Sequence, residues 1–357
     1  MFNMIRHWYN KYFSDPQIVV LISMLLLGFF FILLFGKYIA PVIAAIVIAY
    51  LLDGLVVFLE KIKVNRLLSV LVVFILFLTC LLCVFFILLP NLIGEVMQLF
   101  QQLPQMIRTI QKELILLLQK YPDIVSEKQV AQLSDYLVSL ASEYGKKILT
   151  FSLSSVKSLI AVIIYLILVP ILVFFFLKDK DLILKWFKKY IPDNSGLVYQ
   201  VFRDVNSQIS KYVRGKLIEI LIVWICSFIV FSIMNFEYSM LLSFLVGLST
   251  IIPYIGAAVT YIPIMLVAFF QWGITSQFLY IVIAYSIIQL IDGNVLAPLL
   301  LAGVVNIHPV AIIVAILIFG GIWGVWGLFF AIPLATLAHV VIKVWINNIL
   351  DSEVKNA

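Results

Sequence analysis

Apolar runs about as long as a bilayer is thick recur along the whole chain, and they constrain the fold more than any other feature. A helix needs about 20 apolar residues to cross the hydrocarbon core of a membrane. Candidate crossing runs cover 17–36, 38–59, 67–90, 151–177, 217–235, 239–270, 274–300 and 307–347. Only 12% of the 357 residues are charged, about half the share usual in a soluble domain. The sequence therefore predicts an all-α, polytopic integral membrane protein with about eight transmembrane segments.

The last three runs are longer than one crossing, and each contains proline or glycine. Proline removes a backbone donor and clashes with the preceding turn of a helix. Irregular backbone at membrane depth is tolerated where it is buried in protein or lines a water-filled space. Broken or re-entrant helices are therefore expected in the C-terminal half.

Lysine and arginine cluster beside the apolar runs, as the positive-inside rule describes. Cations gather in the N-terminal segment, the 60–66 turn, the 178–216 segment and the C-terminal tail, with Lys37 as an exception. With eight crossings these four segments fall on one side, which predicts that both termini are cytoplasmic. This distribution favours membrane lipids over nucleic acid as the reason for the net charge of +6.

Two polar insertions complete the predicted organisation. The segments are residues 1–90 (three transmembrane helices), 91–150 (an extracytoplasmic amphipathic hairpin), 151–177 (a fourth transmembrane helix), 178–216 (a basic cytoplasmic segment) and 217–350 (a C-terminal transport core). In the hairpin, apolar residues recur at steps of three and four, with a break at Pro122 and a second helix starting at Ser126. The hairpin either covers the membrane domain or forms a subunit contact or lid. The basic segment either fixes topology or contacts anionic headgroups.

Carboxylates are rare in the C-terminal core. No lysine or arginine occurs between Lys216 and Lys343, and the only acids there are Glu219, Glu237 and Asp292. A carboxylate at a helix centre in the membrane is costly and usually faces a protein interior or a wet cavity. Glu237 fits a loop, and Glu219 fits either a functional site or an interfacial ion pair with Lys216, three residues earlier.

Asp292 has no cation near it in sequence and lies in the segment from Gln289 to Pro298. Gln289 and Asp292 share a helical face, and Pro298 frees the carbonyl of Asn294. These polar groups either line a binding site, as in the broken helices of many secondary transporters, or only tie helices together.

A second irregular segment runs from Ser249 through Pro253 and Tyr254 to Gly256. It combines helix breakers with hydroxyl groups in an otherwise apolar run. The segment is either part of a transport pathway or a kinked packing helix.

At these residues the sequence resembles the AI-2E transporter family, also known under the autoinducer-2 exporter and PerM-type permease names. The matching stretches are 169–179, 208–216, 247–263, 289–298 and 308–333. The resemblance implies an oligomeric bacterial inner-membrane protein that exports small solutes. Some members of the family have been linked to autoinducer-2 and others to sodium/proton exchange. Asp292 stands where the family often has Glu, and Lys216 and Glu219 depart from more neutral residues.

The sequence as a whole predicts a secondary transporter, and not an enzyme. It contains no phosphate-binding loop for ATP and no zinc-protease or serine-hydrolase motif, and we expect no cofactor and no metal site. The expected partners are a small polar solute, a monovalent cation or proton, membrane lipids and further copies of the chain.

We expect Asp292 to be the binding or coupling carboxylate, with Gln289 and Asn294 as hydrogen-bonding neighbours and Glu219 and Pro298 close by. The candidate moving or lining elements are Pro253, Tyr254 and Gly256, and Arg214 with Gly215. The alternatives are a sodium (or lithium)/proton antiporter and a non-transporting scaffold that acts through the hairpin.

Overall fold

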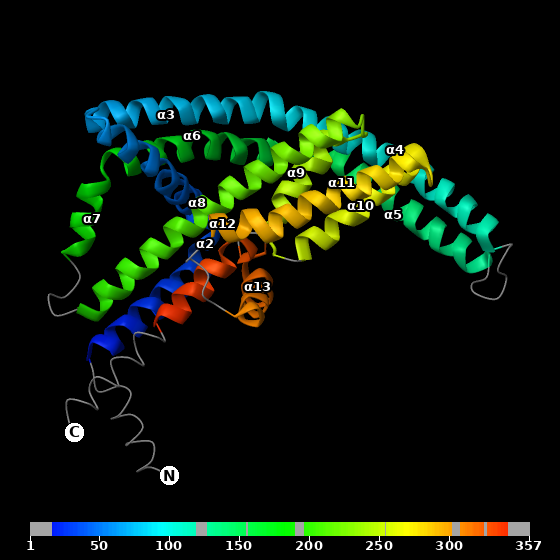
Figure 1. The fold of residues 1–357 in the computed structure, drawn as a ribbon. Helices are drawn as coiled ribbons and strands as arrows, with labels where there is room; N and C mark the ends of the chain where they lie inside the picture. The colour runs from blue at the N-terminus through cyan, green and yellow to red at the C-terminus, as the bar shows by residue number, and fades with distance from the viewer. Residues whose placement is uncertain are drawn as a thin grey trace, which may run out of the picture. The chain divides into compact units, whose positions relative to one another are not determined.

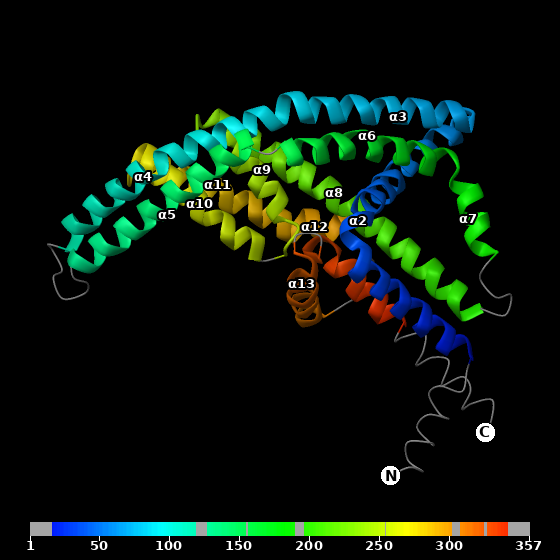
Figure 2. The same ribbon diagram turned by 180° about the vertical axis from the view of Figure 1, so that it is seen from behind.

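The computed structural model describes residues 16–118, 127–154, 156–189, 196–253, 255–301, 308–324 and 327–341, and all regular structure in these ranges is helical (Figures 1 and 2). The helices are α2 (Pro16–Lys61), α3 (Arg66–Cys83), η1 (Val84–Leu88), α4 (Leu89–Leu118), α5 (Glu127–Ser154), α6 (Val156–Lys178), α7 (Lys180–Lys188), α8 (Gly196–Ile233), α9 (Ser239–Ser249), α10 (Ile255–Trp272), α11 (Ser276–Ile291), η2 (Asp292–Leu296), α12 (Ala297–Leu300) and α13 (Pro309–Trp323), followed by a helix over Gly327–Val341. The prediction of an all-α protein is confirmed.

Several of these helices have the length and apolar character of membrane spans. Within the described ranges they are Tyr38–Lys61, Arg66–Lys112, Asn206–Ile233, Ile255–Trp272 and Ser276–Leu300. Shorter apolar helices cover Ile164–Lys178, Ser239–Ser249, Val310–Trp323 and Gly327–Val341. Large apolar side chains such as Phe86, Ile262 and Leu317 are exposed, which suits an outer surface in contact with lipid. The chain is therefore a multi-pass membrane protein.

The N-terminal part differs from the expected pattern. The runs 17–36 and 38–59 form one continuous helix, α2, of 46 residues, which at 1.5 Å per residue is about 69 Å long. The division of this segment into two spans at Lys37 is therefore wrong. Gly36 and Lys37 are both helical, and Pro41 is accommodated inside the same helix.

Helices also continue through two other expected boundaries. Residues 66–118 are helical without interruption through α3, η1 and α4, and α8 runs from the basic segment into the apolar run after Lys216. The helical hairpin is nevertheless present: α4 and α5 pack side by side (Figure 1). Pro122 and Ser126, where its turn and cap are predicted, lie outside the described residues.

The chain folds into two compact units built from segments distant in sequence. Unit 1 comprises Met1–Leu78, Val162–Gly215 and Leu301–Ala357, and unit 2 comprises Thr79–Ala161 and Lys216–Leu300. In unit 1, α2, α3 and α6 pack through apolar side chains, most of them alanine or valine. The buried members are Ala45, Ala49, Val56, Val70, Val73, Val169, Val173 and Leu177.

The core of unit 2 joins the base of the hairpin to α8, α9, α10 and α11. A carboxylate of the hairpin also bonds to α9. Glu95 Oε2 accepts a hydrogen bond from the backbone amide of Leu241 at 2.7 Å. Leu241 lies in the first turn of α9, where amides lack partners within their own helix. A negative charge there also interacts favourably with the helix dipole.

The broken helices expected in the C-terminal half are confirmed. The 239–270 run divides into α9 and α10, and the last run is interrupted after α13 at Gly324, whose φ is 60°. In the 274–300 run the helix is not broken but widened into the π-helical turn η2. These irregular points position the residues that follow.

Candidate functional site

Asp292 lies in the π-helical turn η2. The amide of Ala297 donates to the carbonyl of Asp292, five residues back. Pro298 accounts for the wider turn, because a proline ring clashes with the carbonyl four residues earlier, that of Asn294. The Asp292 side chain is 7% exposed, and its Oδ1 is buried with no hydrogen-bond partner among the described residues. The sequence-predicted carboxylate is thus held inside the protein with an unused acceptor.

Gln289 lies one helical turn before Asp292 on the same face of the run. Its Nε2 is buried and has no hydrogen-bond partner within the described part of the chain. Its side chain also lies beside the hydroxyl of Tyr285, one further turn back. Gln289 and Asp292 thus lie one turn apart, and both act on the hydroxyl of Tyr285.

Asn294 and Pro298 have a different position. Both side chains are exposed, and Asn294 Nδ2 donates to the backbone carbonyl of Leu290 at 2.9 Å. The amide of Asn294 thus bonds to its own helix instead of facing Asp292. Pro298 acts on the site only through the backbone, by widening the turn.

Lys216 and Glu219 form a buried ion pair on α8. Lys216 Nζ lies 2.8 Å from Glu219 Oε1, and the two side chains are 3% and 2% exposed. The second oxygen of Glu219, Oε2, is buried without a partner in the described chain. Burying a pair is costly unless its remaining polar atoms are satisfied, so this geometry does not fit an ordinary interfacial pair.

The charges of Lys216 and Glu219 act on Asp292, so the three residues form one electrostatic cluster in unit 2. With all three ionised the cluster carries +1 from Lys216 and −1 from each carboxylate, a net charge of −1. An uncompensated charge in the membrane interior is costly. The cluster is therefore suited to take up one proton or one monovalent cation.

A chain of hydroxyl groups connects Gln289 with the irregular segment before α10. The Tyr285 hydroxyl contacts Thr260 Oγ1 and donates to the carbonyl of Ala257 at 2.9 Å. Thr260 Oγ1 donates in turn to the carbonyl of Gly256 at 3.0 Å. The two segments singled out by the sequence thus meet through α10 and α11.

The irregular segment itself covers the end of α9, the half-buried Pro253 and the start of α10. Tyr254 lies outside the described residues. Gly256 is buried, and a Cβ atom added to it would lie 1.8 Å from the backbone carbonyl oxygen of Ser249. Only glycine permits this close passage of α10 by the end of α9.

Replacing Gly256 with alanine should therefore force α9 and α10 apart and lower both the folded yield and the transport rate. Gly94→Ala is the matched control, because an added Cβ at Gly94 meets nothing within 4 Å. Size-exclusion profiles after heating, followed by a transport assay, measure the difference. If Gly256→Ala is as stable as Gly94→Ala, the close passage does not determine the fold.

Arg214 and Gly215 belong to unit 1, on the part of α8 that precedes Lys216. Gly215 is buried. The half-buried Arg214 packs its guanidinium against Gly54 of α2. These two predicted residues are thus part of a different packed unit from Asp292.

Sequence reasoning missed several polar residues of unit 2. Ser227 Oγ and Trp224 Nε1 on α8 are buried without hydrogen-bond partners in the described residues. Lys216 is predicted from the sequence only as an interfacial partner of Glu219, and not as a member of the site. A signal for Tyr285 existed, because it lies four residues before Gln289 and seven before Asp292, on the same helical face.

The chain matches a family model described as AI-2E family transporter over residues 20–347. It is 39% identical over 345 residues to PerM of Escherichia coli (strain K12), named as a permease, covering 97% of this chain and 98% of PerM. It is also 29% identical over 332 residues to YueF of Bacillus subtilis (strain 168), named as a transport protein, covering 90% of this chain and 86% of YueF.

Proposed function

Since the chain belongs to the AI-2E transporter family, we propose that it is a secondary transporter that exports a small polar solute, driven by an ion or proton gradient. The observation that carries this proposal is the buried cluster of Asp292, Glu219 and Lys216, with its net charge of −1. Uptake of a proton or monovalent cation neutralises this charge. Binding of the coupling ion therefore lowers the free-energy cost of keeping the cluster away from water. A gradient-driven cycle requires such a dependence of the protein's free energy on the bound ion.

The solute is proposed to bind beside the same cluster, where unpartnered polar atoms are available. Gln289 Nε2 is a donor, and Asp292 Oδ1 and Glu219 Oε2 are acceptors. Buried polar groups without partners are rare in folded proteins, and several together favour a site for a polar ligand. A hydroxyl- or carbonyl-bearing solute fits these donors and acceptors.

We further propose that the protein resides in the bacterial inner membrane, with both termini cytoplasmic, and works as a homo-oligomer in contact with lipids. The lysine and arginine residues in each terminal segment and the family support this placement. This support does not rest on the number of crossings, which the continuous helix α2 changes.

A sodium (or lithium)/proton antiporter without an organic solute is the second candidate. The cluster favours it, because one negative charge can be neutralised alternately by a cation and by a proton. Reconstituted protein in liposomes with an internal pH dye distinguishes the two. A pH change driven by sodium or lithium alone supports the antiporter.

The exporter is tested in cells. In a strain lacking the protein the solute should accumulate several-fold, and expression of the wild type should return it to the medium, as measured by mass spectrometry of cells and medium. A protonophore combined with a sodium ionophore should abolish this export. The absence of any solute that responds to the protein, or export that this combination leaves unchanged, would contradict a gradient-driven exporter.

A further inference from the structure

A second group of charged side chains lies in unit 1, where α2, α7 and α8 contribute one residue each. Lys180 Nζ of α7 lies 2.7 Å from Asp53 Oδ2 of α2. The Asp53 side chain is 13% exposed and the Lys180 side chain 36% exposed, so this ion pair is partly buried. Arg214 of α8 lies against Gly54, the next residue along α2.

Arg214 makes no hydrogen bond and no ion pair with the described residues, and its Nε is buried without a partner. Arginine carries five N–H donors on a planar fork, so a half-buried arginine usually pairs with an oxyanion or a carbonyl. The charges at this point are one negative, Asp53, and two positive, Lys180 and Arg214, a net charge of +1.

The geometry at Gly54 shows how the guanidinium is oriented. A Cβ atom added to Gly54 would lie 3.0 Å from Arg214 Cζ and 3.2 Å from each of Nη1 and Nη2. Nearly equal distances to the three atoms mean that the flat face of the guanidinium rests on the glycine. Its N–H groups lie in the guanidinium plane, parallel to the surface of α2, so none of them points into Gly54 and they remain available to an acceptor.

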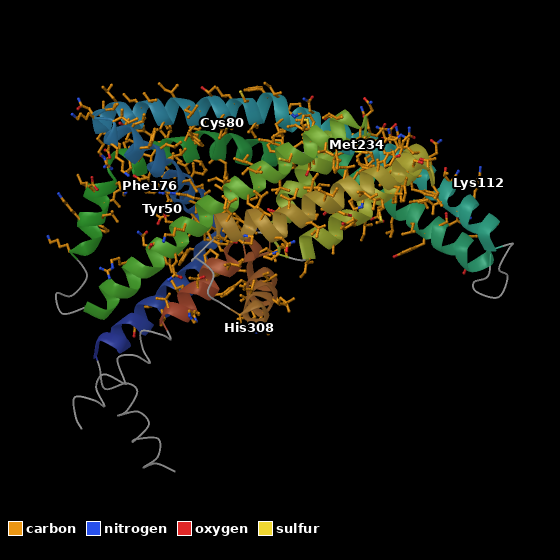
Figure 3. All side chains as sticks on the ribbon, in the orientation of Figure 1. Tyr50, Cys80, Lys112, Phe176, Met234 and His308 are labelled. Carbon is orange, nitrogen blue, oxygen red and sulfur yellow. The ribbon has the colours of Figure 1, made fainter. Side chains whose placement is uncertain are left out.

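Helix α2 also contacts α8 through Tyr50, which is labelled in Figure 3 and lies one turn before Gly54. The Tyr50 hydroxyl donates to Asn206 of α8, whose backbone oxygen and Oδ1 are both 2.8 Å away. This contact joins the same two helices that meet where Arg214 packs against Gly54.

We propose that Arg214, lying flat on Gly54 beside the Asp53–Lys180 pair, is the core of an oxyanion-binding site for a carboxylate or phosphate group. One monoanion neutralises the net charge of +1, and two of its oxygens match the guanidinium fork. The group is supplied either by a free anion or by a lipid headgroup. This proposal does not depend on transport, because binding alone is measured.

The test uses full-length protein in nanodiscs of zwitterionic phosphatidylcholine, with inorganic phosphate as the probe at constant ionic strength. Tryptophan fluorescence reports the unfolding midpoint, since the chain has seven Trp residues. Phosphate should raise the midpoint of the wild type by about 2 °C or more, as expected for a ligand that binds the native state. A second arm replaces free phosphate with phosphatidylglycerol in the disc.

Two pairs of variants make the result specific. Arg214→Gln should lose the shift, whereas Arg203→Gln, an exposed arginine on the same helix, should keep it. Gly54→Ala should weaken the shift by displacing the guanidinium, whereas Gly28→Ala on α2 should not, since nothing lies within 4 Å of its added Cβ.

A shift with free phosphate that Arg214→Gln abolishes supports a site for soluble oxyanions. A shift seen only with the anionic lipid, and again lost in Arg214→Gln, supports the same site occupied by a headgroup. No shift in either arm, or an equal shift in Arg214→Gln, overturns the proposal.

Discussion

Transport by the Asp292→Asn variant should fall to the level of liposomes without protein. Asparagine has nearly the same shape as aspartate, so the η2 turn should persist, but an amide neither takes up a proton at physiological pH nor carries a negative charge. The cluster would then hold one positive and one negative charge, and would no longer need a coupling ion. Counterflow or ion-driven pH change in proteoliposomes measures the loss.

Two further variants separate charge from shape. Asp292→Glu keeps the charge with a longer reach, and it should retain measurable transport. Glu237→Gln removes an exposed carboxylate of the same unit and should transport like the wild type. Wild-type rates in Asp292→Asn would show that this carboxylate has no part in coupling.

The Lys216→Met variant should be less stable than the wild type by about 3–5 kcal/mol. The substitution leaves Glu219, whose side chain is 2% exposed, as a buried carboxylate without its cation. The double variant Lys216→Met, Glu219→Met should recover most of this stability, because apolar side chains of similar volume often replace a buried pair at little cost. Its transport should nevertheless remain impaired, because the cluster has lost two of its three charges.

The Glu143–Lys147 pair of α5 offers a matched control. Lys147 Nζ lies 2.6 Å from Glu143 Oε1, but the Glu143 side chain is 58% exposed and the Lys147 side chain 62% exposed. Lys147→Met should therefore cost less than about 1 kcal/mol. Unfolding free energies in detergent or nanodiscs compare the two sites. If Lys216→Met costs no more than Lys147→Met, the pair at Lys216 is hydrated in the membrane.

Features that depend on local sequence could be predicted. The apolar runs, the periodic stripes of the hairpin and the break near Pro253 all follow from residues close together in the chain. The burial of Asp292 followed from the same kind of argument, since no nearby residue could neutralise it. The continuous helix through Lys37 shows the limit of that approach, because a short gap between two apolar runs does not break a helix by itself.

Features that depend on contacts distant in sequence could not be predicted. The bond between Glu95 and the amide of Leu241 joins residues 146 positions apart. The spacing of Lys216 and Glu219 fits a surface pair and a buried pair equally well, and only the packing of other helices decides between them. Asn294 could either face Asp292 or bond to its own helix, and one backbone carbonyl, that of Leu290, settles its orientation.

The π-helical turn η2 also changes the directions in which the side chains after it point around the helix axis. Its hydrogen bond spans five residues instead of four, so the turn accommodates one additional residue. An α-helix advances by about 100° per residue, and the side chains before and after η2 are therefore out of phase by about that angle. A helical wheel drawn through Ser276–Leu300 as one regular helix would place Ala297–Leu300 on the wrong face.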